Sequence, residues 1–143
     1  MHFLVVTQYF PPEIGAAPVR LAAITRQLLE HGHTVEVVTS MPNYPVGKTF
    51  PGYRGAVYCK EHLDGVTVHR AWTFPARGLG LGRVANYSSY ILAGALEGMI
   101  CRRADVVFVE SPPLFTMAIG VALARVHNAA LVFNVAEIGR AHV

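Results

Sequence analysis

Apolar runs of strand length alternate with segments of helical periodicity along the chain. Residues 2–10 form a continuous apolar and β-branched run, which is typical of a strand covered on both faces, and Pro11 and Pro12 end it. Between about residues 17 and 31 the apolar positions recur at helical spacing, and Gly32 stands where a helix C-cap favours glycine. The polar residues of this helix are expected to point into solvent: Arg20, Gln27 and Glu30.

The alternation continues through the middle of the chain. "HTVEVVTS" at 33–40 predicts a second strand, and the helix before it favours a right-handed βαβ unit. Residues 41–55 are rich in proline and glycine, which predicts a long loop. "AVYCKEHLDGVTVHRAW" at 56–72 predicts two strands joined by a turn at Asp64 and Gly65.

The last third of the chain predicts helix, strand, helix and strand. A helix is expected over about 83–103, followed by a buried strand in "ADVVFVES" at 104–111. Ser111 suits a helix N-cap and Pro112 a first helical position, in a helix that continues over 114–128. "AALVFNV" at 129–135 predicts one more buried strand.

This order of elements predicts an α/β fold, a doubly wound, mostly parallel Rossmann-like sheet with a β-hairpin insertion. In such sheets ligands bind outside the carboxyl ends of the strands, near the point where the strand order reverses. We therefore expect four segments to meet at one edge: "QYFPPEIGAAP" at 8–18, "SMPNYP" at 40–45, "ESPPLF" at 110–115 and "NVAE" at 134–137.

Composition narrows the class of protein. The 143 residues, 52% hydrophobic and 15% charged, suit one globular domain. The net charge of +3 comes without a dense run of Lys or Arg, so we expect no nucleic-acid partner, whereas an anionic ligand would suit it. Cys59 and Cys101 have neither metal-ligand nor disulfide spacing, so they are interpreted as small hydrophobes in a reducing cytosol. No secretory signal and no transmembrane helix is expected.

The loop after the first strand is the main candidate for ligand chemistry. It carries a single glycine, Gly15, so the G-x-G-x-x-G dinucleotide fingerprint is absent and an oxidoreductase is disfavoured. A small-residue loop before a helix offers backbone N–H groups to a phosphate, but Gly15 serves equally well as a tight-turn residue. "GLGLG" at 78–82 does not directly follow a predicted core strand and is interpreted as a connector.

Other catalytic patterns are missing. Ser111 lacks the G-x-S-x-G context of a nucleophile, and the seven histidines lack metal-ligand spacing, so each is expected at the solvated surface. Glu13 and Glu110 can both reach the strand-end edge. Capping or orienting roles are expected for them more than acid–base catalysis.

Several segments together carry a resemblance to a known family. They are "YFPPEIGAAPVRLAAITRQLLEHGHTVEVVTSMPNYPVGK", "PGYRG", "LDGVTVHRAW", "NYSSY", "ADVVFVESPPLF" and "FNV". In this order and spacing, the chain resembles the N-terminal half of bacterial GT-B glycosyltransferases. It is most similar to the retaining family-four enzymes of surface-polysaccharide synthesis, in the fucosamine-transferase and colanic-acid-type branch.

The resemblance implies a function and a set of site residues. The implied activity is transfer of a sugar from a nucleoside-diphosphate donor to a lipid-linked or saccharide acceptor, without cofactor or protein-bound metal, at the cytoplasmic face of the membrane. The essential glutamates are expected in a C-terminal domain that this chain lacks, so the chain alone is expected to be inactive. Gly15 and Ala16 match the loop near the donor diphosphate. Residues that match acceptor-side segments are Asn43, Tyr44, Asn86, Tyr87, Glu110, Ser111, Pro112 and Pro113.

The end of the chain departs from the family pattern. Relatives usually continue after the last strand with Asp-Leu-Trp-Pro, whereas Ala136 is followed here by "EIGRAHV". A common sequencing-library adapter, translated in one frame, gives the same residues and then a stop. We therefore expect residues 1–136 to be an incomplete N-terminal domain and 137–143 to be a non-native tail, with a natural C-terminus as the alternative. A free-standing nucleotide- or phosphate-binding module of Rossmann or flavodoxin type is the alternative function, and an epimerase or dehydrogenase is a more distant one.

Overall fold

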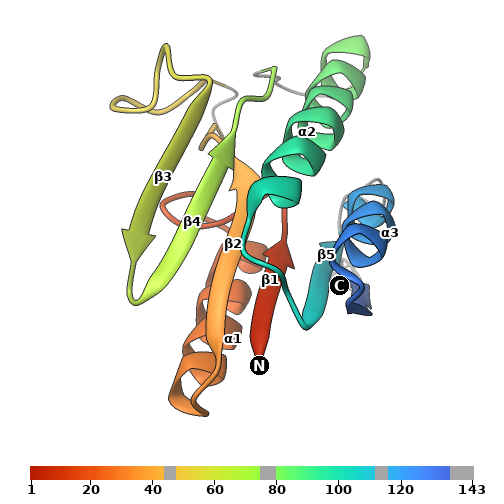
Figure 1. Ribbon diagram of the computed structural model, residues 1–143. Helices are drawn as coiled ribbons and strands as arrows, with labels where there is room; N and C mark the ends of the chain where they lie inside the picture. The colour runs from red at the N-terminus through yellow and green to blue at the C-terminus, as the bar shows by residue number, and fades with distance from the viewer. Residues whose placement is uncertain (44–47, 75–79, 112–115, 136–143) are drawn as a thin grey trace, which may run out of the picture.

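The computed structural model describes residues 1–43, 48–74, 80–111 and 116–135 (Figure 1). The strands are β1 (His2–Val6), β2 (Thr34–Ser40), β3 (Tyr58–Leu63), β4 (Val66–Ala71), β5 (Val106–Ser111) and β6 (Ala130–Val135). The helices are α1 (Ala16–Glu30), α2 (Leu81–Ile100) and α3 (Thr116–His127).

The six strands form one sheet in the order β3-β4-β2-β1-β5-β6. All neighbouring strands are parallel except the hairpin pair β3 and β4. From β1 the chain moves to β2, then to the edge strand β3 and back to β4, before it crosses to β5 on the other side of β1 and continues to β6. The doubly wound, mostly parallel sheet is therefore confirmed, and its strand order reverses between β1 and β5.

Alternating residues of the central strands supply two separate cores. Leu4 and Val6 of β1 pack with Tyr90 of α2 and Ile119 of α3, whereas Val5 packs with Leu21 of α1. Because successive strand side chains point to opposite faces, a continuous apolar run requires helices on both sides. Figure 1 shows α1 partly hidden behind β2, while α2 lies in front of the sheet.

Local turn signals in the sequence are reproduced. Asp64 and Gly65 both have positive φ, 49° and 83°, which is the conformation of a tight two-residue hairpin turn. At the end of α1, the Gly32 N–H donates to the Leu29 carbonyl and the His33 N–H to the Leu28 carbonyl. This is the Schellman arrangement, and Gly32 adopts the φ of 83° that it requires.

The first and last strands differ from expectation. Strand β1 ends at Val6 rather than at residue 10, because the Gln8 carbonyl accepts hydrogen bonds from the hydroxyls of Ser40 (2.7 Å) and Thr39 (3.2 Å) outside the strand ladder. The prediction that strand β6 is buried is wrong. It is an edge strand in which Val132 is 44% and Val135 56% exposed. The predicted N-cap role of Ser111 and helix start at Pro112 depend on residues 112–115, which lie outside the described residues.

Three histidines expected at the surface are buried instead: His2, His69 and His127. His127 Nδ1 accepts from the Ala104 N–H at 3.1 Å, and its Nε2 lies 2.8 Å from the Gly98 carbonyl oxygen. It therefore joins the end of α3 to the end of α2 and the approach to β5. Such long-range partners are invisible to a search for short ligand spacings.

Candidate functional site

The carboxyl ends of β1, β2, β4, β5 and β6 meet at one edge of the sheet because these strands are parallel. The segment 7–15, between β1 and α1, lies at the centre of this edge beside the point of strand reversal. Side chains from this segment and from α1 form hydrogen bonds to the loop after β2, to helix α2 and to the end of β5. The sequence-based expectation that separate loops gather here is therefore realised for the described parts of those loops.

Arg20 and Glu110 form an ion pair at this edge. Glu110 is fully buried, and its Oε1 accepts from Arg20 Nε at 2.8 Å and also from Arg20 Nη2. Its Oε2 accepts from Nδ2 of Asn134, the residue opposite it on β6, at 2.7 Å. Both carboxylate oxygens are therefore used to hold polar side chains in place, in keeping with an orienting role.

Arg20 corrects one sequence-based expectation. It was predicted to point into solvent on α1, yet it crosses to β5 and its side chain is only 36% exposed. Arg20 lies in the second turn of α1, where the helix begins above the sheet edge, so its guanidinium reaches the end of a neighbouring strand. A helical wheel places residue 20 on the polar face of α1, but in the fold this side chain faces the end of β5.

The N-terminus of α1 lies one helical turn before Arg20 of this ion pair. Gly15 is the N-cap residue, with φ 160° and ψ 178°, and no side chain caps the helix there. This extended conformation is open to any residue, so a positive φ is not the reason for glycine. The first turn holds no acidic residue and contains exposed Ala16. The helix therefore presents uncapped N–H groups and the positive end of its dipole.

Glu13 ties the loop after β1 to the loop after β2. Its carboxylate accepts from the Asn43 N–H at 2.8 Å and from the Phe10 N–H at 3.3 Å, and Glu13 is only 3% exposed. Asn43, one of the predicted acceptor-side residues, is also buried, and its Nδ2 donates to the Met41 carbonyl at 2.9 Å. Asn43 therefore stabilises the conformation of this loop through buried hydrogen bonds.

Asn86 plays a similar part on α2. Its Oδ1 accepts from Gln8 Nε2, and its Nδ2 donates to the Phe74 carbonyl at 2.6 Å. Asn86 is 1% exposed, so it joins the segment after β1 to the segment after β4. Gln8 is buried as well, and its Oε1 has no hydrogen-bond partner. Gln8 was not among the predicted residues, although a glutamine within an apolar run was an available signal.

A second cationic group lies on the α2 side of the edge. Arg83 Nη1 is 3.5 Å from the Tyr9 hydroxyl, and its guanidinium lies over the Tyr87 ring at 5.8 Å from the centroid. Burial, and then the neighbouring Tyr87, raise the pKa of Tyr9, so its phenol keeps its proton. Arg102 and Arg103 follow the end of α2 and precede β5, so they lie at the opposite edge of the sheet.

The glycine-rich segment at 78–82 comes after β4, which belongs to the main sheet because it pairs in parallel with β2. Residues 72–77 separate the segment from β4, and its interpretation as a connector stays a prediction. Residues 75–79 lie outside the description, and Gly80, with φ 104°, is the N-cap residue of α2.

The predicted site residues fall into three groups. Six are described and lie around the strand-end edge: Gly15, Ala16, Asn43, Asn86, Tyr87 and Glu110. Tyr44, Pro112 and Pro113 lie outside the described residues. Ser111 pairs with Val135 at the end of β5, and its side chain is not described.

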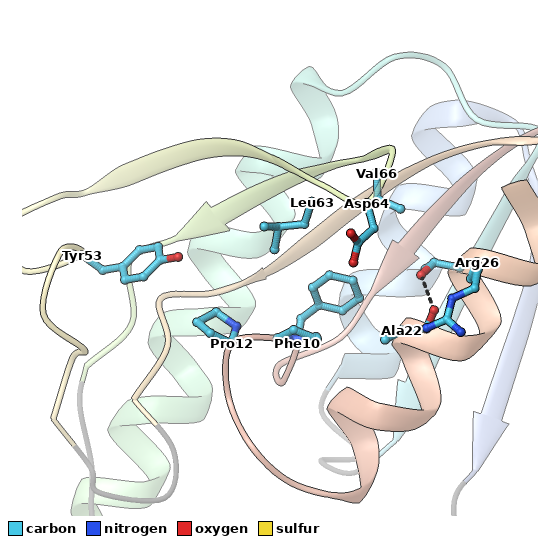
Figure 2. Close-up of a pocket in the computed structure, with 10 residues that line it drawn as sticks. Phe10, Pro12, Ala22, Arg26, Tyr53, Leu63, Asp64 and Val66 are labelled. Carbon is cyan, nitrogen blue, oxygen red and sulfur yellow. Dashed lines mark hydrogen bonds between the residues drawn. The ribbon is translucent and has the colours of Figure 1, made fainter.

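A cavity of about 190 Å³ lies on the α1 face, away from the ion pair (Figure 2). Figure 2 shows Phe10 lying between the hairpin residues Leu63 and Asp64 and the helix residue Ala22. The walls of the cavity are mostly apolar, and Arg26 and Asp64 supply charges at its margin. Residues 10–12 of the segment after β1 line it together with the hairpin turn, and neither Arg20 nor Glu110 is part of its wall.

Comparison of the sequence with known proteins places the chain in a family. The sequence model described as "Glycosyl transferase 4-like domain" matches residues 15–142. No curated protein matches the sequence at a significant level. Among the described residues, no helix combines the length and the apolar character needed to cross a membrane.

Proposed function

Because the chain belongs to the glycosyl transferase 4-like domain family, we propose that it is the N-terminal, acceptor-side domain of a retaining GT-B glycosyltransferase. The proposed reaction moves a sugar from a nucleoside-diphosphate donor to a lipid-linked or saccharide acceptor during surface-polysaccharide synthesis. The proposed place of action is the cytoplasmic face of the membrane. A C-terminal domain would supply most of the donor site and the essential glutamates.

The Arg20–Glu110 pair beside the uncapped start of α1 is the observation that carries this proposal. A diphosphate requires cationic and N–H donors, and helix N-termini supply such donors with a favourable dipole. Glu110, which is itself held by Asn134, fixes the guanidinium, so little side-chain entropy remains to be lost on binding. Gly15 leaves the backbone accessible because it has no side chain.

We propose that the acceptor binds beside three parts of the chain. They are the segment after β2, the segment after β5 and the residues of α2 that follow its first turn. Asn43 and Asn86 act there as positioning residues, since their amide groups bond the loops rather than point outward. Tyr44, Ser111 and Pro112 are proposed to contact the acceptor. Arg83 adds positive charge on the same side, which favours an acceptor that carries pyrophosphate.

Binding of nucleoside diphosphates to the purified chain tests the donor half of the proposal. UDP, GDP and inorganic pyrophosphate are titrated and followed by calorimetry or by amide chemical shifts. Arg20→Gln should weaken binding by about 10- to 150-fold, the equivalent of about 1.5–3 kcal/mol for a hydrogen bond to a charged group. Arg26→Gln is the matched control, because Arg26 is exposed on the same helix and does not contact Glu110.

Gly15→Val gives a second arm of the same titration. Since Gly15 has extended φ and ψ, valine fits the backbone there, and lost affinity would report obstruction of the ligand. Equal affinities for the wild type and both site variants would refute the diphosphate role. Tight binding of pyrophosphate with no preference for a nucleoside diphosphate would instead favour the free-standing phosphate-binding module.

Activity of an intact enzyme tests the transfer reaction. A protein in which this domain is joined to its C-terminal half is incubated with a panel of nucleotide-sugar donors and a lipid-pyrophosphate sugar acceptor. Transfer from one donor is expected, while the 143-residue chain alone should show none. Turnover by the chain alone would contradict the proposed division of labour between two domains.

A further inference from the structure

Three side chains of the kinds that bind metal ions lie together on the α2 face of the sheet, and a fourth, His2, contacts one of them, Glu36. They come from three strands and a helix end: His2 of β1, Glu36 of β2, His69 of β4 and Cys101 directly after α2. His2, His69 and Cys101 are 4%, 5% and 8% exposed, and the Glu36 side chain is 14% exposed. The cluster lies toward the amino ends of β1 and β2, whereas Arg20 and Glu110 lie at the edge formed by the carboxyl ends of the strands.

The ligand atoms already converge. His2 Nε2 is 3.2 Å from Glu36 Oε1, and His69 Nε2 is 2.6 Å from Glu36 Oε2. One ligand atom each of Glu36, His69 and Cys101 lie within 4.8 Å of one another. His2 Nε2 is buried and forms no hydrogen bond of good geometry, although it faces this carboxylate. A buried ring nitrogen without a hydrogen bond is costly unless something else occupies its lone pair.

Both imidazoles are held by their other ring nitrogen. His2 Nδ1 is 2.7 Å from the Thr34 hydroxyl, and His69 Nδ1 is 2.9 Å from the Tyr58 hydroxyl. When Nδ1–H donates to such a hydroxyl, the Nε2 lone pair is free and points at the cluster. An outer partner of this kind is what metal-binding histidines usually have.

The backbone of His2 is fixed as well. Its N–H donates to Asp105 Oδ2 at 2.7 Å, and the Asp105 N–H donates back to the His2 carbonyl at 2.8 Å. The first strand is therefore tied to the approach to β5 at the residue that supplies a ligand. This reduces the entropy lost when His2 binds an ion.

Without a metal, Cys101 behaves as a buried thiol. It donates to the Glu97 carbonyl at 3.3 Å, and burial, followed by the nearby Glu36 charge, raises its pKa. A divalent cation reverses this preference, because it stabilises the thiolate and offsets the charge of Glu36. The cluster thus supplies two negative ligands and two neutral ones.

We propose that His2 Nε2, His69 Nε2, Cys101 Sγ and a Glu36 oxygen form a four-coordinate zinc site. Zinc distances of about 2.0–2.3 Å to such ligands imply ligand–ligand separations of roughly 3.3–3.7 Å in a tetrahedron. His2 Nε2 lies 3.2 Å from Glu36 Oε1, whereas His69 Nε2 lies 2.6 Å from the other oxygen, Oε2, so the Glu36 carboxylate and His2 have to shift for all four ligands to surround one ion. Four protein ligands leave no open position, so the site is structural and joins β1, β2 and β4 to the end of α2.

Metal titration of the full chain tests this inference independently of the proposed transferase function. The chain is stripped with a chelator and titrated with Zn²⁺, and separately with Co²⁺ as a spectroscopic probe. One equivalent of zinc should bind and raise the melting temperature. Cobalt should give intense visible bands of tetrahedral coordination and a thiolate charge-transfer band.

The two cysteines provide a matched pair of variants. Cys101→Ser should abolish the thiolate band and reduce zinc affinity at least tenfold. Cys59→Ser should change neither, because Cys59 lies on edge strand β3 and is not among the clustered ligands. His69→Gln is paired in the same way with His62→Gln, since His62 is exposed.

An outer-shell variant separates coordination from general stability. Tyr58→Phe removes only the hydroxyl near His69 Nδ1 and should lower zinc affinity by about 10- to 100-fold while the metal-free fold persists. Circular dichroism of each metal-free variant shows whether it has folded. The inference is overturned if the folded wild type binds no stoichiometric zinc, or if the cobalt spectrum is the same in Cys101→Ser.

Discussion

Arg70→Met should destabilise the domain more than any surface charge change. The Arg70 side chain is fully buried on β4, where its Nε donates to Glu61 Oε1 at 2.5 Å. Its Nη1 donates to the Ser40 carbonyl at 3.2 Å, and its Nη2 donates to the Pro11 carbonyl. Methionine fills part of the volume but leaves these acceptors without their donor.

The size of the effect follows from these partners. Removing one member of a buried ion pair typically costs about 3–5 kcal/mol, because the remaining charge stays desolvated. Glu61 keeps a hydrogen bond from the Tyr53 hydroxyl at 3.0 Å, and its side chain is 22% exposed, so the lower end applies, about 3 kcal/mol. For a domain of this size that corresponds to a melting temperature lower by roughly 10 °C.

Urea denaturation and thermal melts followed by circular dichroism measure this change. Arg54→Met is the control, because Arg54 is exposed and its loss should change the free energy of unfolding by less than about 0.5 kcal/mol. Glu61→Gln completes a double-mutant cycle with Arg70→Met, and a coupling above about 1 kcal/mol is expected. A loss below about 1 kcal/mol in Arg70→Met would refute the reasoning that this buried cluster anchors the strand-end loops.

Two further predictions concern packing and a buried hydroxyl. Gly120→Ala should lower the free energy of unfolding by about 1–3 kcal/mol despite alanine's helix propensity, because its Cβ would lie 2.2 Å from Val109 Cγ2 on β5. Gly98→Ala should cost less in the same urea titration, since its Cβ meets the flexible end of Leu123, and the opposite ranking would contradict the packing. Tyr90→Phe should cost about 1–2 kcal/mol by removing a fully buried hydroxyl that lies 2.7 and 2.9 Å from two main-chain carbonyl oxygens, and an unchanged melting temperature would show that these carbonyls find other donors.

The features of the fold that sequence predicts are those encoded by local patterns. The parallel strands follow from apolar runs, and the hairpin turn follows from Asp64 and Gly65, two residue types that tolerate positive φ. The end of α1 follows from Gly32 for the same reason. The exposure of β6 does not follow, because its apolar run is the same whether a strand is central or at an edge.

The site residues that sequence misplaced depend on register between distant segments. Arg20 meets Glu110 across 90 positions, and its contact depends on where α1 starts above the sheet. His2 and His69 reach Glu36 only because β1 and β4 flank β2, so that residues far apart in sequence share one face. A search for short ligand spacings has no access to such a cluster. The topology of the predicted sheet, in contrast, placed the segments that contain Asn43 and Glu110 at one edge without any knowledge of register, and the acceptor-side roles of Asn43, Asn86 and Glu110 stay predictions.

The buried Glu110 sets a condition on the proposed donor site. Its charge cancels that of Arg20, so the pair fixes the direction of the guanidinium but adds little net positive potential. Attraction of a diphosphate then depends on the dipole at the start of α1, on Arg83 and on the overall charge of +3. These contributions act near the protein surface and are screened by salt, whereas the oriented hydrogen bonds of Arg20 act only at contact. The geometry therefore suits a site in which this domain orients the phosphates while a second surface supplies most of the binding energy.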